Sequence, residues 1–217
     1  MGTITRSFAN NITTSGVLLP ASLVNNSIAN VTAYNAAVAT GNMVLLSTQT
    51  ASDSASISFT TGISSTYKEY QFWFIDIHSR TDNVTFNFNL STDSGSNYNV
   101  TKTSTFFRAY NDESGTDFNL GYQGAFDLAQ STSFQPITNG LGNGADENGG
   151  GYISLFNPAS TTYVKHYIAT TNVYEQSNYT MAGYTAGYGN TTSAVNAVRF
   201  QMSSGNFDGT ILLYGIV

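Results

Sequence analysis

The sequence has 217 residues, of which only 9% are Asp, Glu, Lys or Arg, and a formal net charge of −6. Ordinary soluble domains hold about 25% charged residues, so the polar surface here must come from Ser, Thr, Asn, Gln and Gly. The acidic balance argues against nucleic acid and anionic membranes as partners, because both bind basic surfaces. The chain has no cysteine, which excludes disulfides and thiolate metal sites.

Residues 1–40 differ in composition from the rest of the chain. They contain a single charged residue, Arg6, and few aromatic residues. Their Asn and β-branched content disfavours a stable helix, so we predict an extended N-terminal arm that orders against a partner. The apolar residues expected to bind that partner are Ile4, Phe8, Ile12, Val17, Leu18, Leu19, Leu23 and Val24.

Residues 41–217 carry the pattern of an all-β domain. Residues 56–60 and 84–90 alternate polar and apolar side chains, as half-buried strands do. Residues 67–78 are apolar on both faces near their centre, which predicts a central strand buried on both sides. Further strands are expected at 43–49, 98–110, 116–128, 152–156, 163–174, 195–202 and 210–217.

Turn residues separate these strands at regular intervals. The glycine-rich segment 139–151 is predicted to be an exposed, mobile loop that packs against no core. Val198, Phe200 and Met202 are expected to point inward, and the turn after them to lead into a partner strand at 210–217, closing a terminal hairpin. The spacing predicts an antiparallel β-sandwich or jelly roll over residues 41–217.

Three stretches combine strand and turn residues in a recurring order. They are 57–70 (ISFTTGISSTYKEY), 90–98 (LSTDSGSNY) and 198–216 (VRFQMSSGNFDGTILLYGI). This pattern resembles virion structural proteins of marine tailed bacteriophages. The resemblance implies a jelly-roll virion protein, often trimeric, and it applies equally to capsid decoration proteins and to tail fibres, since one fold hosts several functions.

On this basis we expect a non-enzymatic protein of the virion surface, made in the host cytoplasm. The leading hypothesis is a capsid decoration, or cement, protein that forms a homotrimer and binds the major capsid protein through the arm. The alternative is a tail-fibre or receptor-binding module that contacts host glycans. A polysaccharide hydrolase is disfavoured because carboxylates are few and no pair of them stands out.

The tyrosines Tyr174, Tyr179, Tyr184 and Tyr188 are separated mainly by Asn, Gly and other small residues. A tyrosine offers a flat apolar ring and a hydroxyl group, so these residues could bind a glycan. The same residues could instead cover the core or form a subunit contact, because tyrosine is enriched at interfaces. Both interpretations remain open at this point.

Other candidate sites are weak. Asp76 and His78 stand two residues apart on one predicted strand, but the chain lacks the G-x-S-x-G pattern of a serine nucleophile, which favours a hydrogen-bonded histidine at a strand end. Two histidines argue against a zinc site. The carboxylates near residues 112–117 and 146–147 suit calcium, but no EF-hand pattern is present, which favours solvated turn carboxylates. We predict no metal and no cofactor.

Overall fold

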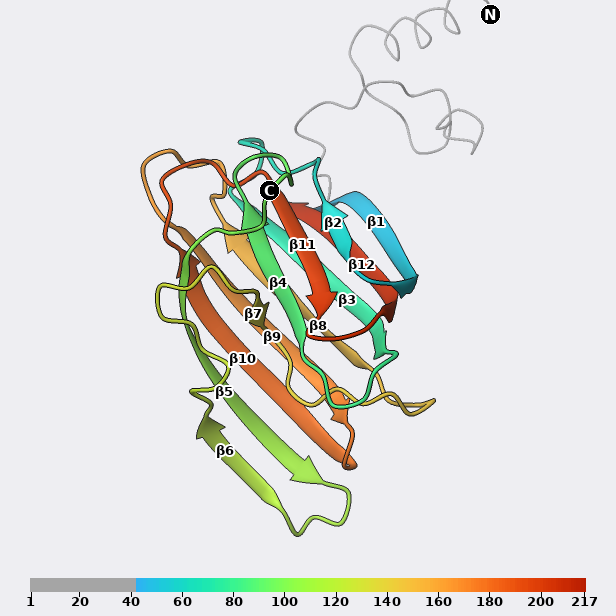
Figure 1. Cartoon of the computed structure of the whole chain (residues 1–217). Coiled ribbons are helices and arrows are strands. Elements are labelled where there is room, and N and C mark those ends of the chain that lie inside the picture. The colour runs from blue at the N-terminus through green and yellow to red at the C-terminus, as the bar shows by residue number, and fades with distance from the viewer. Residues whose placement is uncertain (1–41) are drawn as a thin grey trace, which may run out of the picture. The chain divides into compact units, whose positions relative to one another are not determined.

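The computed structural model of the chain describes residues 42–217 (Figure 1). The arm residues named above, and the predicted domain boundary after residue 40, lie outside the described residues. The described part forms antiparallel strands in two packed sheets. They are β1 (Met43–Ser54), β2 (Ile57–Phe59), β3 (Glu69–Ser79), β4 (Phe86–Ser91), β5 (Lys102–Asp112), β6 (Phe118–Tyr122), β7 (Gln135–Pro136), β8 (Gly149–Phe156), β9 (Lys165–Glu175), β10 (Tyr179–Gly189), β11 (Ala197–Met202) and β12 (Phe207–Ile216).

The strand order is that of a jelly roll with an extension. The small sheet has the order β2-β11-β4-β7, and the large sheet begins β1-β12-β3-β8. Along the chain these eight strands cross from one sheet to the other at every step except between β4 and β7, which is the jelly-roll connectivity of two Greek keys. The predicted all-β antiparallel sandwich is therefore confirmed.

Four further strands widen the large sheet. They follow β8 in the order β9-β10-β5-β6, and come from two hairpins inserted between β4 and β7 and between β8 and β11. We call these four strands the extension. In Figure 1 the small sheet lies in front of the jelly-roll half of the large sheet, and β5 and β6 reach beyond it.

The core between the sheets is built from phenylalanines. Phe200 of β11 is fully buried at its centre. Its ring centroid lies 5.2 Å from those of both Phe72 and Phe74 in the large sheet, and 5.8 Å from that of Phe86 in its own sheet. The predicted inward residues of segments 84–90 and 198–202 are all buried, because a period-two pattern places alternate side chains on one face.

The segment after β6 covers the inner face of the extension. Phe126 packs on Phe106 with 5.4 Å between ring centroids, and Leu141 is fully buried in the core. The prediction that residues 139–151 form an exposed loop without core contacts is therefore wrong at both ends, because Gly149 and Gly151 already belong to β8. A Cβ on Gly151 would lie 2.3 Å from the Thr170 carbonyl oxygen, so glycine here allows two strands to approach closely.

The C-terminal strands differ from the prediction in their pairing. β11 lies in the small sheet between β2 and β4, whereas β12 lies in the large sheet between β1 and β3. The predicted terminal hairpin is thus wrong, and the turn between these strands carries the chain from one sheet to the other. Strand alternation is compatible with either arrangement, because it specifies which face is buried and not which strand lies beside it.

Candidate functional site

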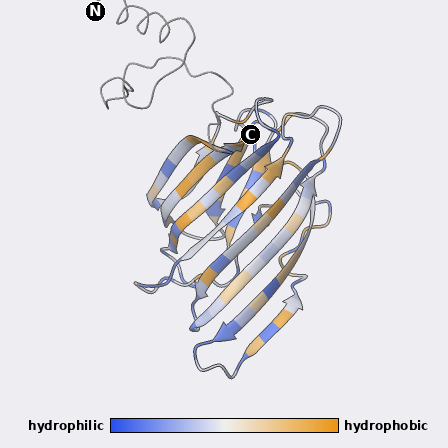
Figure 2. Ribbon diagram, turned by 180° about the vertical axis from the view of Figure 1, so that it is seen from behind, coloured by the Kyte–Doolittle hydropathy of each residue, from blue (hydrophilic) through white to orange (hydrophobic). Residues whose placement is uncertain are grey.

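The large sheet has an outer face, which is the face turned away from the small sheet and toward the viewer in Figure 2. Segment 67–78 was predicted to be buried on both faces, and this is wrong for the outer one: Trp73 and Ile75 of β3 are exposed, although β3 is a central strand. Large apolar residues of the extension join them. The exposed fractions run from 37% to 70% for Trp73, Ile75, Ile168, Tyr184, Phe107, Phe118, Leu120 and Tyr122.

Cross-strand pairing arranges part of this surface as a row that crosses seven strands. Trp73 stacks on Tyr152 of β8, with 5.5 Å between ring centroids and 25° between ring planes. Tyr184 of β10 stacks on Phe107 of β5, with 4.9 Å between ring centroids and 14° between ring planes. We call this the aromatic row. From one side of the sheet to the other it consists of Leu212, Trp73, Tyr152, Thr170, Tyr184, Phe107 and Tyr122.

The residues at the centre of the outer face are uncharged. On the described strands, the residues of the aromatic row and of the outer-face rows on either side of it are Thr, Ser, Asn, Gln, Ala, Gly and apolar residues. The nearest carboxylate is that of Glu69 at the start of β3, which accepts bonds from Gln71 and Ser154 in one of these rows. The polar groups beside Trp73 are already bonded: its indole Nε1 donates to Gln71 at 3.1 Å, and the Gln71 amide donates to Glu69 at 2.9 Å. This combination of aromatic residues and missing charge is typical of the centre of a protein interface.

Charged residues gather instead at the ends of the strands. Arg80 and Asp208 form an ion pair at one end of β3 and β12. Asp112 ends β5, Glu113 follows it, and Glu175 ends β9 at the same end of the large sheet, because β3, β9 and β5 run in the same direction. These charged residues thus lie at one end of the large sheet and away from the aromatic row.

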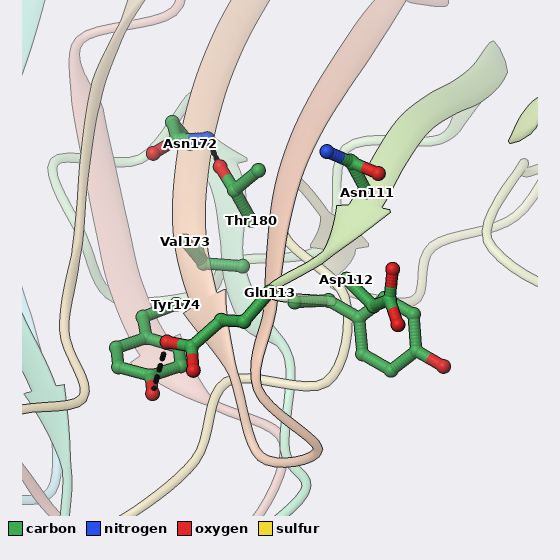
Figure 3. Close-up of a pocket in the computed structure, with 8 residues that line it drawn as sticks. Asn111, Asp112, Glu113, Asn172, Val173, Tyr174 and Thr180 are labelled. Atoms are coloured by element: carbon green, nitrogen blue, oxygen red, sulfur yellow. Dashed lines mark hydrogen bonds between the residues drawn. The ribbon is translucent and has the colours of Figure 1, made fainter. Parts of the chain in front are cut away.

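A shallow depression of about 430 Å³ lies at the acidic end of β5, β9 and β10 (Figure 3). Its lining includes Asn111, Asn172 and Thr180 from the strands, and Tyr174 and Glu113 from their ends. The Tyr174 hydroxyl donates to a Glu113 carboxylate oxygen at 3.0 Å, and this bond raises the pKa of the tyrosine. The depression offers amide, hydroxyl and carboxylate groups next to one aromatic ring.

The structure divides the four predicted tyrosines. Tyr174 and Tyr179 lie at the depression, where Tyr179 donates to Asp117 at 2.8 Å. Tyr184 belongs to the aromatic row, and Tyr188 lies further along β10 beside His166, with 6.0 Å between ring centroids. They do not form one cluster, because residues 179–189 form a strand that the sequence pattern did not predict, and a strand spreads its side chains over about 3.4 Å per residue.

Sequence reasoning also missed most of the aromatic row as a functional surface. Two sequence patterns could have pointed to this surface, one in β3 and one in β6. Residues 67–78 are apolar on two faces, and Phe118, Leu120 and Tyr122 alternate with polar or small residues in a short strand. Neither pattern indicates which apolar face lacks a partner, because that depends on how the two sheets pack.

The candidate pair Asp76 and His78 makes local hydrogen bonds. Asp76 adopts a positive φ of 51° at a β-bulge and accepts a bond from Asn148 at 3.2 Å. His78 Nδ1 lies 2.6 Å from the Glu147 carbonyl oxygen, so this nitrogen carries the proton and donates. The two side chains thus bond to different partners, as expected for a histidine at a strand end.

The calcium candidate is a turn carboxylate. Asp112 accepts bonds from the backbone nitrogens of Thr116 at 2.7 Å and Asp117 at 3.0 Å, and from the hydroxyl of Ser114. The Ser114 bond, with these backbone bonds, lowers the pKa of Asp112 to about 2. Within residues 42–217, no three acidic or histidine side chains converge as metal ligands.

Comparison with known proteins identifies no relative: no family model matches the chain, and no curated protein and no solved structure is significantly similar to it. In the part of the chain that the structure describes, no helix has the length and apolar character required to cross a bilayer.

Proposed function

We propose that this chain is a structural protein of a virus particle surface, of the capsid decoration type, and that it acts by binding rather than by chemistry. The observation that carries the proposal is the outer face of the large sheet, where aromatic residues and uncharged polar residues cover the centre of an eight-stranded sheet. The phage origin rests on the sequence resemblance, and the jelly-roll connectivity agrees with it.

The physical reason is the unfavourable free energy of leaving such a face in water. Soluble monomers rarely expose contiguous apolar patches larger than a few hundred Å² unless the patch is functional. A face without charge is also suited to burial, because no ion has to be desolvated when a partner covers it. The outer face therefore has the composition of an assembly surface.

The copy number in purified particles tests this function. We expect quantitative mass spectrometry to find hundreds of copies per particle, as in a protein that coats a capsid. A few dozen copies or fewer would favour a location on the tail. Absence of the chain from purified particles would contradict both.

Attachment is proposed to involve residues 1–40 and the major capsid protein, with the sandwich outside the shell. Deleting residues 1–40 should abolish binding to particles that lack the protein, while the circular dichroism spectrum of the remaining chain keeps its β signature. Undiminished occupancy by the truncated chain would contradict a role of the arm in attachment.

A second candidate function is binding of host glycans by a tail-associated module. The depression beside Tyr174 favours it, because amides recognise sugar hydroxyls and an aromatic ring packs on the apolar face of a sugar. A glycan array should then give a signal that Tyr174→Ala or Asn111→Ala removes. Tyr163→Ala is the matched control, since Tyr163 is exposed in the loop before β9, at the opposite end of that strand. An array without any signal for the unmodified chain would contradict this function.

A further inference from the structure

We propose that the outer face of the large sheet is an isologous interface between two copies of this chain, with a two-fold axis that runs along β9 at Thr170. This inference rests on the proposed function in treating the outer face as an assembly surface. It goes further in naming the partner, the symmetry and the residues that meet. The oligomer it specifies is a dimer, in place of the trimer that the sequence resemblance implies.

The aromatic row has mirrored composition about its middle residue, Thr170. One strand away on either side stand Tyr152 and Tyr184. Two strands away stand Trp73 and Phe107. Each half of the row thus presents a stacked aromatic pair at the same distance from β9, and Leu212 and Tyr122 follow three strands away.

A two-fold rotation places each half of the row in one copy against the opposite half of the row in the other copy. When the axis lies between two stacked sheets and parallel to β9, rotation exchanges the two halves of the row. Tyr152 of one copy then meets Tyr184 of the other, and Trp73 meets Phe107. Each contact occurs twice, as an isologous interface requires, and sheets stacked about 10 Å apart leave room for their side chains to interdigitate.

The face is large enough for a stable dimer. Strands about 4.8 Å apart and roughly ten residues long give the eight-stranded sheet a face on the order of 1,000 Å². A standard interface buries about 800 Å² on each partner. Most of the sheet can therefore contribute, and the rim can remain in water.

The charge distribution favours a second copy over a charged partner. Two chains with net charge −6 repel each other, but the central rows of the face carry no ionic group that would be brought together. The Glu69 carboxylate at the start of β3 is bonded to Gln71 and Ser154 of its own chain. The carboxylates of Asp112, Glu113 and Asp208 lie at strand ends, on the rim, where solvent screens them. Self-pairing makes use of a row with similar halves, because each aromatic pair then meets an aromatic pair of the second copy, whereas an unrelated partner has no need of it.

The mass of the full chain in solution tests the inference. Multi-angle light scattering after gel filtration should give twice the chain mass at micromolar concentration. Phe107→Glu should give the mass of a monomer, with a dissociation constant raised at least about 100-fold, because it places an unpaired charge at a hot-spot position. Its melting temperature under monomeric conditions should change little, since Phe107 is exposed. Tyr163→Glu, an exposed position away from the outer face, should remain dimeric.

A charge-pair experiment tests the axis. Trp73→Lys and Phe107→Glu should each be monomeric alone, and an equimolar mixture should form a heterodimer, because the new lysine of one chain then faces the new glutamate of the other. A mixture that stays monomeric would overturn the placement of the axis along β9, and a wild-type mass of three chains would overturn the two-fold symmetry. A monomeric wild-type chain that is abundant in particles would overturn the dimer and leave the proposed function intact.

Discussion

The two faces of the large sheet are alike in sequence and opposite in environment. On β3, Phe72 and Phe74 point inward and are at most 4% exposed, whereas Trp73 and Ile75 point outward and are about 40% exposed. The four residues are consecutive and all apolar. The difference lies in what covers each face: the small sheet covers the inner one within the same chain. Within residues 42–217, no sheet covers the outer one, and this is the face for which we propose a partner.

The largest expected effect contrasts one phenylalanine from each face. Phe200→Ala removes a ring that contacts both sheets and should lower the free energy of unfolding by about 3–5 kcal/mol. Phe107→Ala, at low protein concentration, should cost less, about 1 kcal/mol, because Phe107 is already 42% exposed in the folded monomer, whereas Phe200 is fully buried. Urea denaturation measures both. Equal losses of the free energy of unfolding in the two variants would contradict the difference in burial between the two faces.

The next largest effect is a pH dependence of the free energy of unfolding, which comes from a buried lysine on the inner face. Lys102 is fully buried, and its Nζ donates to the Val100 carbonyl oxygen at 2.8 Å and to the Asn89 side chain. Desolvation lowers the pKa of Lys102 to about 7. Between pH 7 and 10 the unfolded chain keeps a proton that the folded chain has released, so stability should rise with pH, by at most about 1.4 kcal/mol per pH unit.

Lys102→Met supplies the control for this prediction. The substitution keeps an unbranched side chain and removes the titrating amine, so the rise in stability between pH 7 and 10 should become smaller; burial of Lys165, whose pKa is also lowered by desolvation, leaves the remainder. Urea denaturation of both proteins across this range measures the difference. Identical pH profiles would show that the Lys102 amine keeps the same pKa on unfolding.

Substitutions at two glycines compare a position where neighbouring strands pack tightly with a position on an open strand surface. Gly151→Ala should lower stability by about 2 kcal/mol or more, because its φ of 149° disfavours other residues and a Cβ there meets the backbone of β9. Gly121→Ala on β6 has open space around the new methyl group and should change stability by about 0.5 kcal/mol or less. Thermal melting of the two variants ranks them, and the reverse order would contradict this packing.

The smallest expected effect lies at the acidic rim. Asp112 stabilises its turn as a carboxylate, and this contribution is present above its unfolded pKa and lost as pH falls toward the folded value of about 2. Asp112→Ala should speed hydrogen exchange at the amides of Thr116 and Asp117, which bond to that carboxylate. Exchange in the core strands should not change. Unaltered exchange in the turn would mean that these bonds do not hold it.

Part of the candidate site was predictable and part was not. The sequence singled out Tyr174 and Tyr184 as one candidate group, whereas in the structure they belong to different features, a depression and the aromatic row. Sequence alone could not separate them, because strand β10 was not predicted and its register with β5 and β9 sets which side chains are neighbours. The partners of Tyr184 in the row are far from it in sequence, so no local pattern identifies them.

The sequence by itself determined the fold class, the inward residues of β4 and β11, and the turn position of the carboxylate Asp112. These follow from local chemistry, since period-two alternation orients side chains and Asp, Asn and Gly select turns. Only the tertiary structure decided that β12 leaves β11 for the other sheet, that Leu141 enters the core, and that Trp73 stays exposed. Each of these depends on contacts between distant segments, and alternation along one strand contains no information about which distant segment will cover it.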